Sequence, residues 1–170
     1  MQDVNRSARH SLFSIGSALL LAAGTAAQSL SPKPSAVQYV TVEPAASAQV
    51  VAPGGSVSLW LDVTPKPNIH VYAAGAKDVT PVALIVSPAA GIRPGKPKYP
   101  AAELLASPGA DSPVPVYRKP FRIVQPIAIS KTAKPGQALT IAAALNYESC
   151  DDRLCYPPSS IPVNWVVKVR

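Results

Sequence analysis

The residues of this chain with the clearest capacity for chemistry are its two cysteines, Cys150 and Cys155. The Cα atoms of a disulfide usually lie about 4.4–6.8 Å apart, whereas five extended steps of chain span roughly 17 Å. The chain must therefore reverse direction within residues 151–154. Asp151 and Asp152 suit such a turn because aspartate side chains accept hydrogen bonds from the backbone that follows them. We expect the cysteines to lie side by side at the end of a β-hairpin.

The residues beside the cysteines bear on access and reactivity. Pro157 and Pro158 cannot donate backbone hydrogen bonds and hold the residue before them extended, so we expect them to stop the outgoing strand from pairing beside Cys155. The sulfurs would then have a stiff rim and an open side. Asp151 and Asp152 disfavour a thiolate while Arg153 favours one. The pair is therefore not expected to be a strongly activated nucleophile.

Spacing alone leaves three interpretations of the pair open: thiol–disulfide exchange, a structural clip and a metal site. A bridge closing so short a loop stabilises a fold by only about 2 kcal/mol, and a sandwich gains more when a disulfide joins its two sheets. A lone pair lacks the second ligand pair of a zinc site. His70 lies between Ile69 and Val71 and is expected to be a packed strand residue. We therefore expect neither a metal nor a cofactor.

The elements that hold the cysteines are predicted to be short strands. Twenty prolines and nine glycines divide the chain, and period-2 alternation replaces any long helical periodicity. Seven to nine such strands in this length predict an all-β, immunoglobulin-like antiparallel β-sandwich. The predicted strands are Val37–Val42, Val57–Thr64, Ile69–Ala73, Val82–Val86, Val114–Tyr117, Phe121–Ile129, Leu139–Tyr147 and Ile161–Val169.

Three segments lack a clear strand pattern or interrupt one. Ser87–Pro100 is rich in Pro, Gly and Lys and is expected to be a surface loop. Pro100–Ala106 could form at most a helical turn. Pro126 cannot donate to a strand ladder, so the strand Phe121–Ile129 is predicted to be at an edge or bulged.

The N-terminus has the features of a signal peptide over residues 1–27. Arg6 and Arg9 precede the apolar stretch Leu12–Ala23, and small residues follow at a cleavage site before Gln28. That stretch falls short of the roughly 20 apolar residues that span a bilayer. We expect a flexible lead-in over residues 28–36, one domain over residues 37–170 and no membrane span after cleavage. Export to the periplasm would place both cysteines in an oxidising compartment, where a disulfide is the default state.

The formal charge of +7 is spread along the chain without a basic run. A nucleic-acid site requires a basic stripe or a known motif, and the sequence has neither. The basic surface is expected to help attract an acidic protein partner at most.

The region from Val116 onward resembles the N-terminal periplasmic domain of the thiol:disulfide interchange protein DsbD. The similarity is strongest around the cysteines, and Ile69–Tyr72 adds a fainter match. The matching residues are Val116–Arg118, Phe121–Ile129, Pro135–Gly136, Leu139–Ile141 and above all Asn146–Pro158, which ends in Cys-Tyr-Pro-Pro.

The resemblance implies an immunoglobulin-like domain that transfers electrons through mixed disulfides. Cys155 would form the intermolecular bond, and Cys150 would resolve it. The site would also include Tyr72 and Tyr147 as aromatic neighbours, together with Asp151, Asp152, Arg153, Tyr156, Pro157 and Pro158. In that family an acidic, aromatic cap loop covers the disulfide, whereas the corresponding Pro108–Pro113 contains no aromatic residue.

These observations predict a protein-disulfide reductase-type activity. The membrane relay and thioredoxin-like domain that follow in the family are absent from these residues, so we expect a separate thioredoxin-like or membrane electron donor. The acceptor would be an oxidised periplasmic client, such as a disulfide isomerase or a cytochrome c maturation factor. The alternatives are an immunoglobulin-like binding or structural module with a structural disulfide and, third, a metal-binding chaperone.

Overall fold

Side chains alternate between the core and solvent along the longest strands of this protein. The computed structural model describes residues 37–106 and 112–170, which belong to one unit of the chain, and none of these residues is helical. In β3 (Ser56–Pro65) every second residue from Val57 to Val63 is buried, and in β11 (Cys155–Val169) the same holds from Ile161 onward. This period of two puts one face of each strand in the core.

The strands form two sheets. The first has the order β1-β3-β9-β6, with β1 at Val40–Ala46, β9 at Phe121–Ile129 and β6 at Ile92–Pro94. The second has the order β2-β11-β10-β4-β8-β7, and β5 also pairs with β10. Its other bounds are β2 Val50–Val51, β4 His70–Tyr72, β5 Ala83–Val86, β7 Glu103–Leu105, β8 Val114–Tyr117 and β10 Ala138–Cys150.

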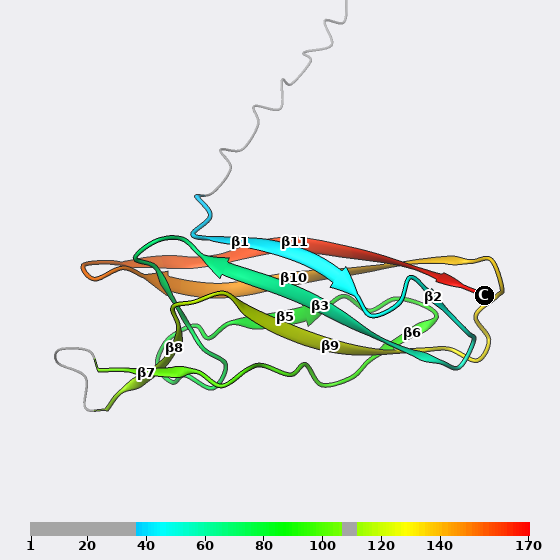
Figure 1. Ribbon diagram of the computed structural model, residues 1–170, viewed down its shortest axis with the longest axis horizontal. Helices are drawn as coiled ribbons and strands as arrows, with labels where there is room; N and C mark the ends of the chain where they lie inside the picture. Colours follow the sequence, from blue (N-terminus) through cyan, green and yellow to red (C-terminus); the bar gives the residue numbers. More distant parts are fainter. Residues whose placement is uncertain (1–36, 107–111) are drawn as a thin grey trace, which may run out of the picture. The chain divides into compact units, whose positions relative to one another are not determined.

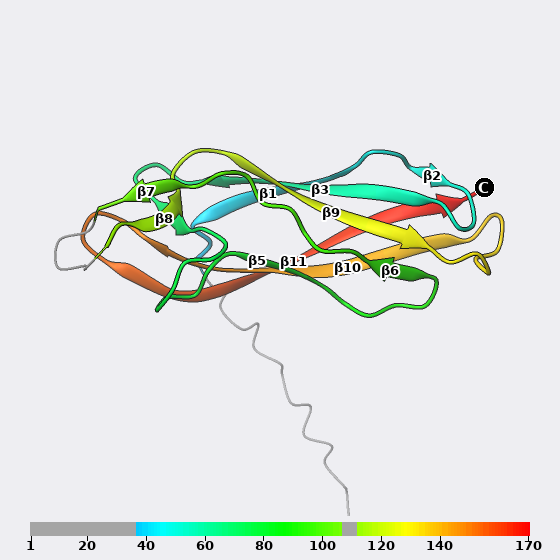
Figure 2. The ribbon, with the colours of Figure 1, turned by 90° about the horizontal axis from the view of Figure 1, so that it is seen from below.

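The two sheets pack face to face, with β3 and β9 on one side of the core and β10 and β5 on the other (Figures 1 and 2). Fully buried side chains from both sheets fill the space between them, among them Leu59, Ile123, Ile141 and Leu145. The indole of Trp165 on β11 also donates a hydrogen bond to the carbonyl of Trp60 on β3, at 3.2 Å. The prediction of an all-β, immunoglobulin-like sandwich is confirmed, and its only parallel pairing among the described strands is β2 with β11.

Several predicted boundaries are wrong. The first strand begins at Val40 rather than Val37 and continues to Ala46, because it pairs with β3 from Pro65 to Leu59. The predicted loop Ser87–Pro100 contains β6, and the predicted helical turn Pro100–Ala106 contains β7. These strands of three residues are fixed by pairing with β9 and β8, which no local alternation reveals.

The prediction that Pro126 marks an edge is wrong, because β9 is paired on both sides, with β3 and β6. The predicted irregularity is found on the β6 side, where the register shifts by one residue between Pro94↔Ile127 and Lys98↔Val124. Pro126 lies opposite Gly95, whose N–H donates to the Pro126 carbonyl at 2.8 Å. The return bond that a proline cannot make is replaced by the buried side chain of Gln125, whose Nε2 donates to the Gly95 carbonyl at 2.7 Å. A neighbouring amide thus supplies the donor that the ladder lacks.

The predicted signal peptide and lead-in, residues 1–36, lie outside the described residues. Within the part of the chain that the structure describes, no helix is long and apolar enough to cross a membrane.

We predict that Gln125→Met destabilises the fold by about 1 kcal/mol, because the Gly95 carbonyl loses its donor. Pro126→Ala restores a backbone N–H at the same place, so Gln125→Met should cost less in that background. Urea unfolding of the two single variants and the double variant measures this coupling. If Gln125→Met lowers the free energy of unfolding equally in the unaltered and the Pro126→Ala backgrounds, the Gln125 amide does not replace the missing backbone donor.

Candidate functional site: the cysteine hairpin

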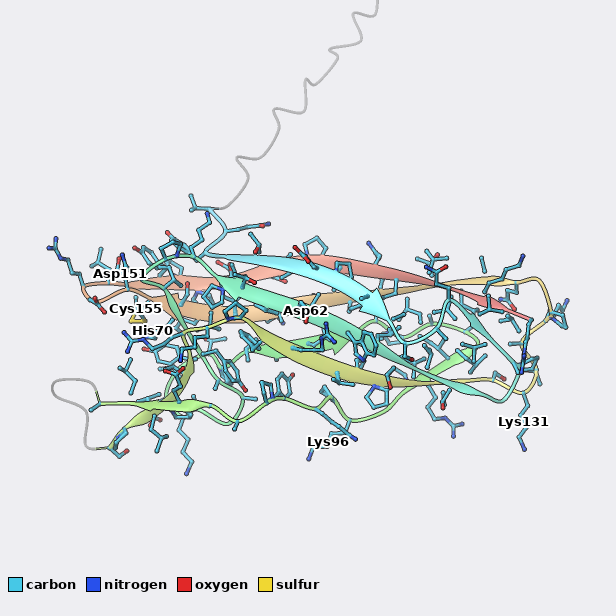
Figure 3. All side chains as sticks on the ribbon, viewed as in Figure 1. Asp62, His70, Lys96, Lys131, Asp151 and Cys155 are labelled. Atoms are coloured by element: carbon cyan, nitrogen blue, oxygen red, sulfur yellow. A yellow bond between two sulfur atoms is a disulfide. The ribbon has the colours of Figure 1, made fainter. Side chains whose placement is uncertain are left out.

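The last residue of β10 and the first residue of β11 are joined by a disulfide. Cys150 and Cys155 are directly opposite each other in the antiparallel register, with Cα atoms 4.0 Å apart. The chain reverses within residues 151–154, as the spacing predicts, and the Asp151 N–H donates to the Leu154 carbonyl at 2.9 Å. Cys155 lies with Asp151 and His70 at one end of the sandwich (Figure 3).

The two sulfur-bearing residues differ in burial. Cys150 is only 2% exposed, whereas Cys155 is an exposed residue. A molecule approaching from solvent therefore reaches Cys155 first. Leu154, next to it in the turn, is 63% exposed and offers apolar surface beside the disulfide.

The carboxylate of Asp151 organises the turn. Its Oδ1 accepts hydrogen bonds from the N–H groups of Arg153 and Leu154, both at 2.7 Å, and its Oδ2 accepts one from the Tyr156 hydroxyl at 2.6 Å. The bond from Tyr156 and the two backbone bonds hold the pKa of Asp151 below its usual value. The negative charge of Asp151 thus stabilises the turn through these three hydrogen bonds.

Tyr156 connects this turn to the first sheet. Its ring stacks on that of Tyr39, with centroids 3.9 Å apart and planes inclined by 18°. Tyr39 also donates its backbone N–H to the hydroxyl of Tyr147, at 3.2 Å. Tyr147 is only 1% exposed, so its side chain is part of the core. It thereby anchors the base of the hairpin. Tyr39 has no local sequence pattern that identifies it with the site.

Tyr72 on β4 lies against both sulfurs. Its hydroxyl oxygen is 3.2 Å from Cys150 Sγ and 3.5 Å from Cys155 Sγ. Since sulfurs in a disulfide carry no proton, the tyrosine hydroxyl is the donor in this state. Burial, followed by the negative charge of Glu148, raises the pKa of Tyr72. The hydroxyl therefore keeps its proton and remains a donor at neutral pH.

His70 is the residue paired with Cys150 in the register between β10 and β4. It is 8% exposed, in agreement with its interpretation as a packed strand residue, and its ring meets Tyr72 edge to face with centroids 5.9 Å apart. Burial lowers the pKa of His70, Arg118 lowers it further, and Asp152 and Asp151 act in the opposite sense. The lowered pKa favours the neutral form of this imidazole, which lies on the strand paired with Cys150.

The remaining predicted neighbours lie on the outer surface of the hairpin. Asp152 and Arg153 are exposed in the turn. Pro157 and Pro158 are also exposed, but they do not stop pairing beside Cys155. The pairing breaks at the prolines themselves, where the ladder lacks their donors, while Tyr156 still pairs with Ser149.

This break is a β-bulge in which Glu148 of β10 faces Pro157 and Pro158 of β11. The Glu148 side chain is half-buried, and one of its carboxylate oxygens lies within 4.8 Å of both sulfurs. The sequence analysis did not identify Glu148 as a site residue. Two thiolates and a carboxylate could bind a soft divalent metal, but only in the reduced protein, because the sulfurs are bonded to each other here.

The sequence matches a family model described as thiol:disulfide interchange protein DsbD, N-terminal, over residues 36–164. A search of curated proteins finds no match. Among solved structures, the N-terminal periplasmic domain of ScsB from Proteus mirabilis is 15% identical with a TM-score of 0.47, over 75% of this chain and 46% of that one. This chain therefore spans less than half of the ScsB domain.

Two further solved structures are more distant. A family 123 glycoside hydrolase from Clostridium perfringens is 12% identical with a TM-score of 0.36, over 76% of this chain and 27% of the hydrolase. AggA, the major subunit of aggregative adherence fimbriae type I from Escherichia coli, is 10% identical with a TM-score of 0.39, over 77% and 95%.

We predict that the backbone amide protons of Arg153 and Leu154 report the titration of Asp151. Because folding lowers the pKa of this carboxylate, its bonds contribute stability above the unfolded value of about 3.9 and lose it as the pH falls through the folded value. NMR titration should show both amide resonances moving with a midpoint below about 3.9. Asp151→Ala should remove this transition, and Asp152→Ala should retain it. A midpoint at or above the unfolded value would contradict the described turn.

Proposed function

The chain belongs to the family of the N-terminal domain of the thiol:disulfide interchange protein DsbD, and from this premise we propose that Cys150 and Cys155 carry electrons between protein partners. The observation that supports this most directly is a disulfide with one buried and one exposed cysteine at the end of a hairpin. The activity is of the protein-disulfide reductase type, and it requires no dissociable cofactor.

The difference in burial supports different roles for the two cysteines. A thiolate of the electron donor attacks the Sγ of Cys155, the exposed residue of the pair, and the bond to Cys150 breaks. Cys150 leaves as a thiolate that takes the electron pair. The Tyr72 hydroxyl, 3.2 Å from Cys150 Sγ, can donate a hydrogen bond to this developing charge.

The second half of the exchange releases the domain. The donor's second thiolate attacks the donor sulfur that is bonded to Cys155 in the mixed disulfide. The donor then leaves with a disulfide of its own, and Cys155 is released as a thiolate. After uptake of two protons the domain holds two thiols, having gained two electrons. Attack by Cys155 on a client disulfide, followed by attack of Cys150 on Cys155, returns both electrons to the client and restores the disulfide.

The proposed partners are proteins rather than small molecules. Leu154, which is 63% exposed in the turn beside Cys155, offers apolar surface to a docking protein. A thioredoxin-like or membrane protein would act as the donor. A disulfide isomerase or a cytochrome c maturation factor would act as the client. The donor and the client would each meet this domain in the periplasm.

We predict that Cys150→Ser traps partners in mixed disulfides through Cys155, because the resolving thiol is then missing. Expression of this variant in the periplasm, followed by non-reducing electrophoresis and mass spectrometry, should show adducts that reducing agent releases.

The matched control is Cys155→Ser, which leaves only the buried Cys150. Adduct formation should fall by about tenfold or more, in line with the dependence of exchange on access to the sulfur. No adducts above background with Cys150→Ser, or equal adducts with both variants, would contradict the assigned roles.

The alternative is a binding or structural module in which the disulfide is a clip. The two functions predict different reduction potentials for the Cys150–Cys155 disulfide. We predict a potential in the range of exchange proteins, roughly −120 to −270 mV. Equilibration of the protein with glutathione or dithiothreitol buffers, followed by alkylation of free thiols, measures this value. A potential below about −300 mV would favour the structural clip.

A further inference from the structure

Glu148 occupies a position that nothing in the exchange steps above requires. It is the residue of β10 at the bulge opposite Pro157 and Pro158. Bulges re-aim side chains and are frequent beside active sites. Here the carboxylate is also fixed from a second direction, because its Oε2 accepts a hydrogen bond from the backbone N–H of Thr80 at 2.9 Å.

Thr80 lies in the loop between β4 and β5, far from Glu148 in sequence. Two separate parts of the fold thus hold a negative charge within 4.8 Å of both sulfurs. The side chain is half-buried, so water screens this charge less than it would at the open surface.

The other charged and titratable groups around the pair lie on β4, just after β8 and in the turn. On β4 the neighbours are Tyr72, a neutral donor, and His70, which is mostly buried. Arg118, which follows β8, acts on His70. In the turn, Asp151 is engaged in its own hydrogen bonds, and Asp152 and Arg153 are exposed with opposite charges.

Attack on a disulfide brings in a negative thiolate, and the transition state spreads that charge over three sulfurs. A fixed carboxylate within 4.8 Å of two of them raises the energy of that state. We propose that Glu148 is a specificity-determining residue that shields the Cys150–Cys155 disulfide electrostatically from small thiolates. It favours protein donors whose docked surface places a cationic or hydrogen-bond-donating group against the carboxylate.

This inference rests on the proposed exchange function and adds the chemistry of the partner. In the shielded reaction a small thiolate attacks Cys155, Cys150 leaves as a thiolate, and a second small thiolate releases Cys155 as the small disulfide forms. The donor and the product are therefore those of ordinary thiol reduction, and only the rate of the first attack depends on Glu148.

The test measures the rate of reduction of the oxidised protein by three small thiols: anionic mercaptoethanesulfonate, neutral mercaptoethanol and cationic cysteamine. For Glu148→Gln the rate with mercaptoethanol should rise about tenfold. The rise should be larger with the sulfonate and smaller with cysteamine. Glu148→Lys should be faster still, and added salt should reduce the differences between variants.

Glu43→Gln is the matched control, since it removes one exposed carboxylate from β1 of the other sheet. Its rates should equal those of the unaltered protein. Tyr72→Phe should slow reduction by all three thiols, because it removes the donor to the leaving sulfur. A merely structural role for Glu148 would change the three thiols by the same factor and would not follow the charge order Glu, Gln, Lys.

A parallel measurement uses reduced thioredoxin as the protein donor. If thioredoxin reduces the unaltered protein but Glu148→Gln leaves the small-thiol rates unchanged, the shield is wrong and the exchange function stands. If neither thioredoxin nor periplasmic partners exchange with the unaltered protein while the small-thiol rates still follow the charge at residue 148, the exchange function fails and the electrostatic effect stands.

Discussion

The direct pairing of Cys150 with Cys155 across two antiparallel strands is the constraint from which the rest of the site follows. A four-residue turn brings the two backbones together, and the Asp151 carboxylate holds that turn by accepting three hydrogen bonds. The backbone pairing therefore positions the sulfurs together with the bond between them. After reduction, the same hairpin keeps both thiols within reach of each other, which a two-electron exchange requires.

The sandwich limits how far this hairpin can move. Tyr147 anchors it in the core, and the Tyr156 ring stacks on Tyr39 of the chain leading into β1. The strand β4 lies beside it and brings Tyr72 to the sulfurs. Three parts of the chain that are distant in sequence thus meet at one end of the fold. Packing throughout the sandwich offsets the conformational entropy lost in ordering the site, so the exposed turn needs few contacts of its own.

Local features could be predicted from the sequence, and long-range ones could not. The reversal between the cysteines follows from their spacing, and the long strands follow from alternation in segments such as Ile161–Val169. The contact of Glu148 with Thr80 depends instead on how the loop between β4 and β5 packs against β10, and no periodic pattern encodes it. The same is true of the short strands β6 and β7. Gln125 beside Pro126 is an intermediate case, because a proline in a buried strand requires a replacement donor, but only the structure identifies it.

In the proposed function, burial and charge select partners at this site in different ways. In the proposed exchange, the exposure of Cys155 and the burial of Cys150 set the order of attack for any nucleophile that can approach. The Tyr72 hydroxyl and the Glu148 carboxylate act on the same sulfurs in opposite directions, since the first stabilises negative charge and the second opposes it. A partner that neutralises the carboxylate on docking leaves only the favourable contact. Under this proposal, the reactivity of the pair is a property of the complex rather than of the free domain.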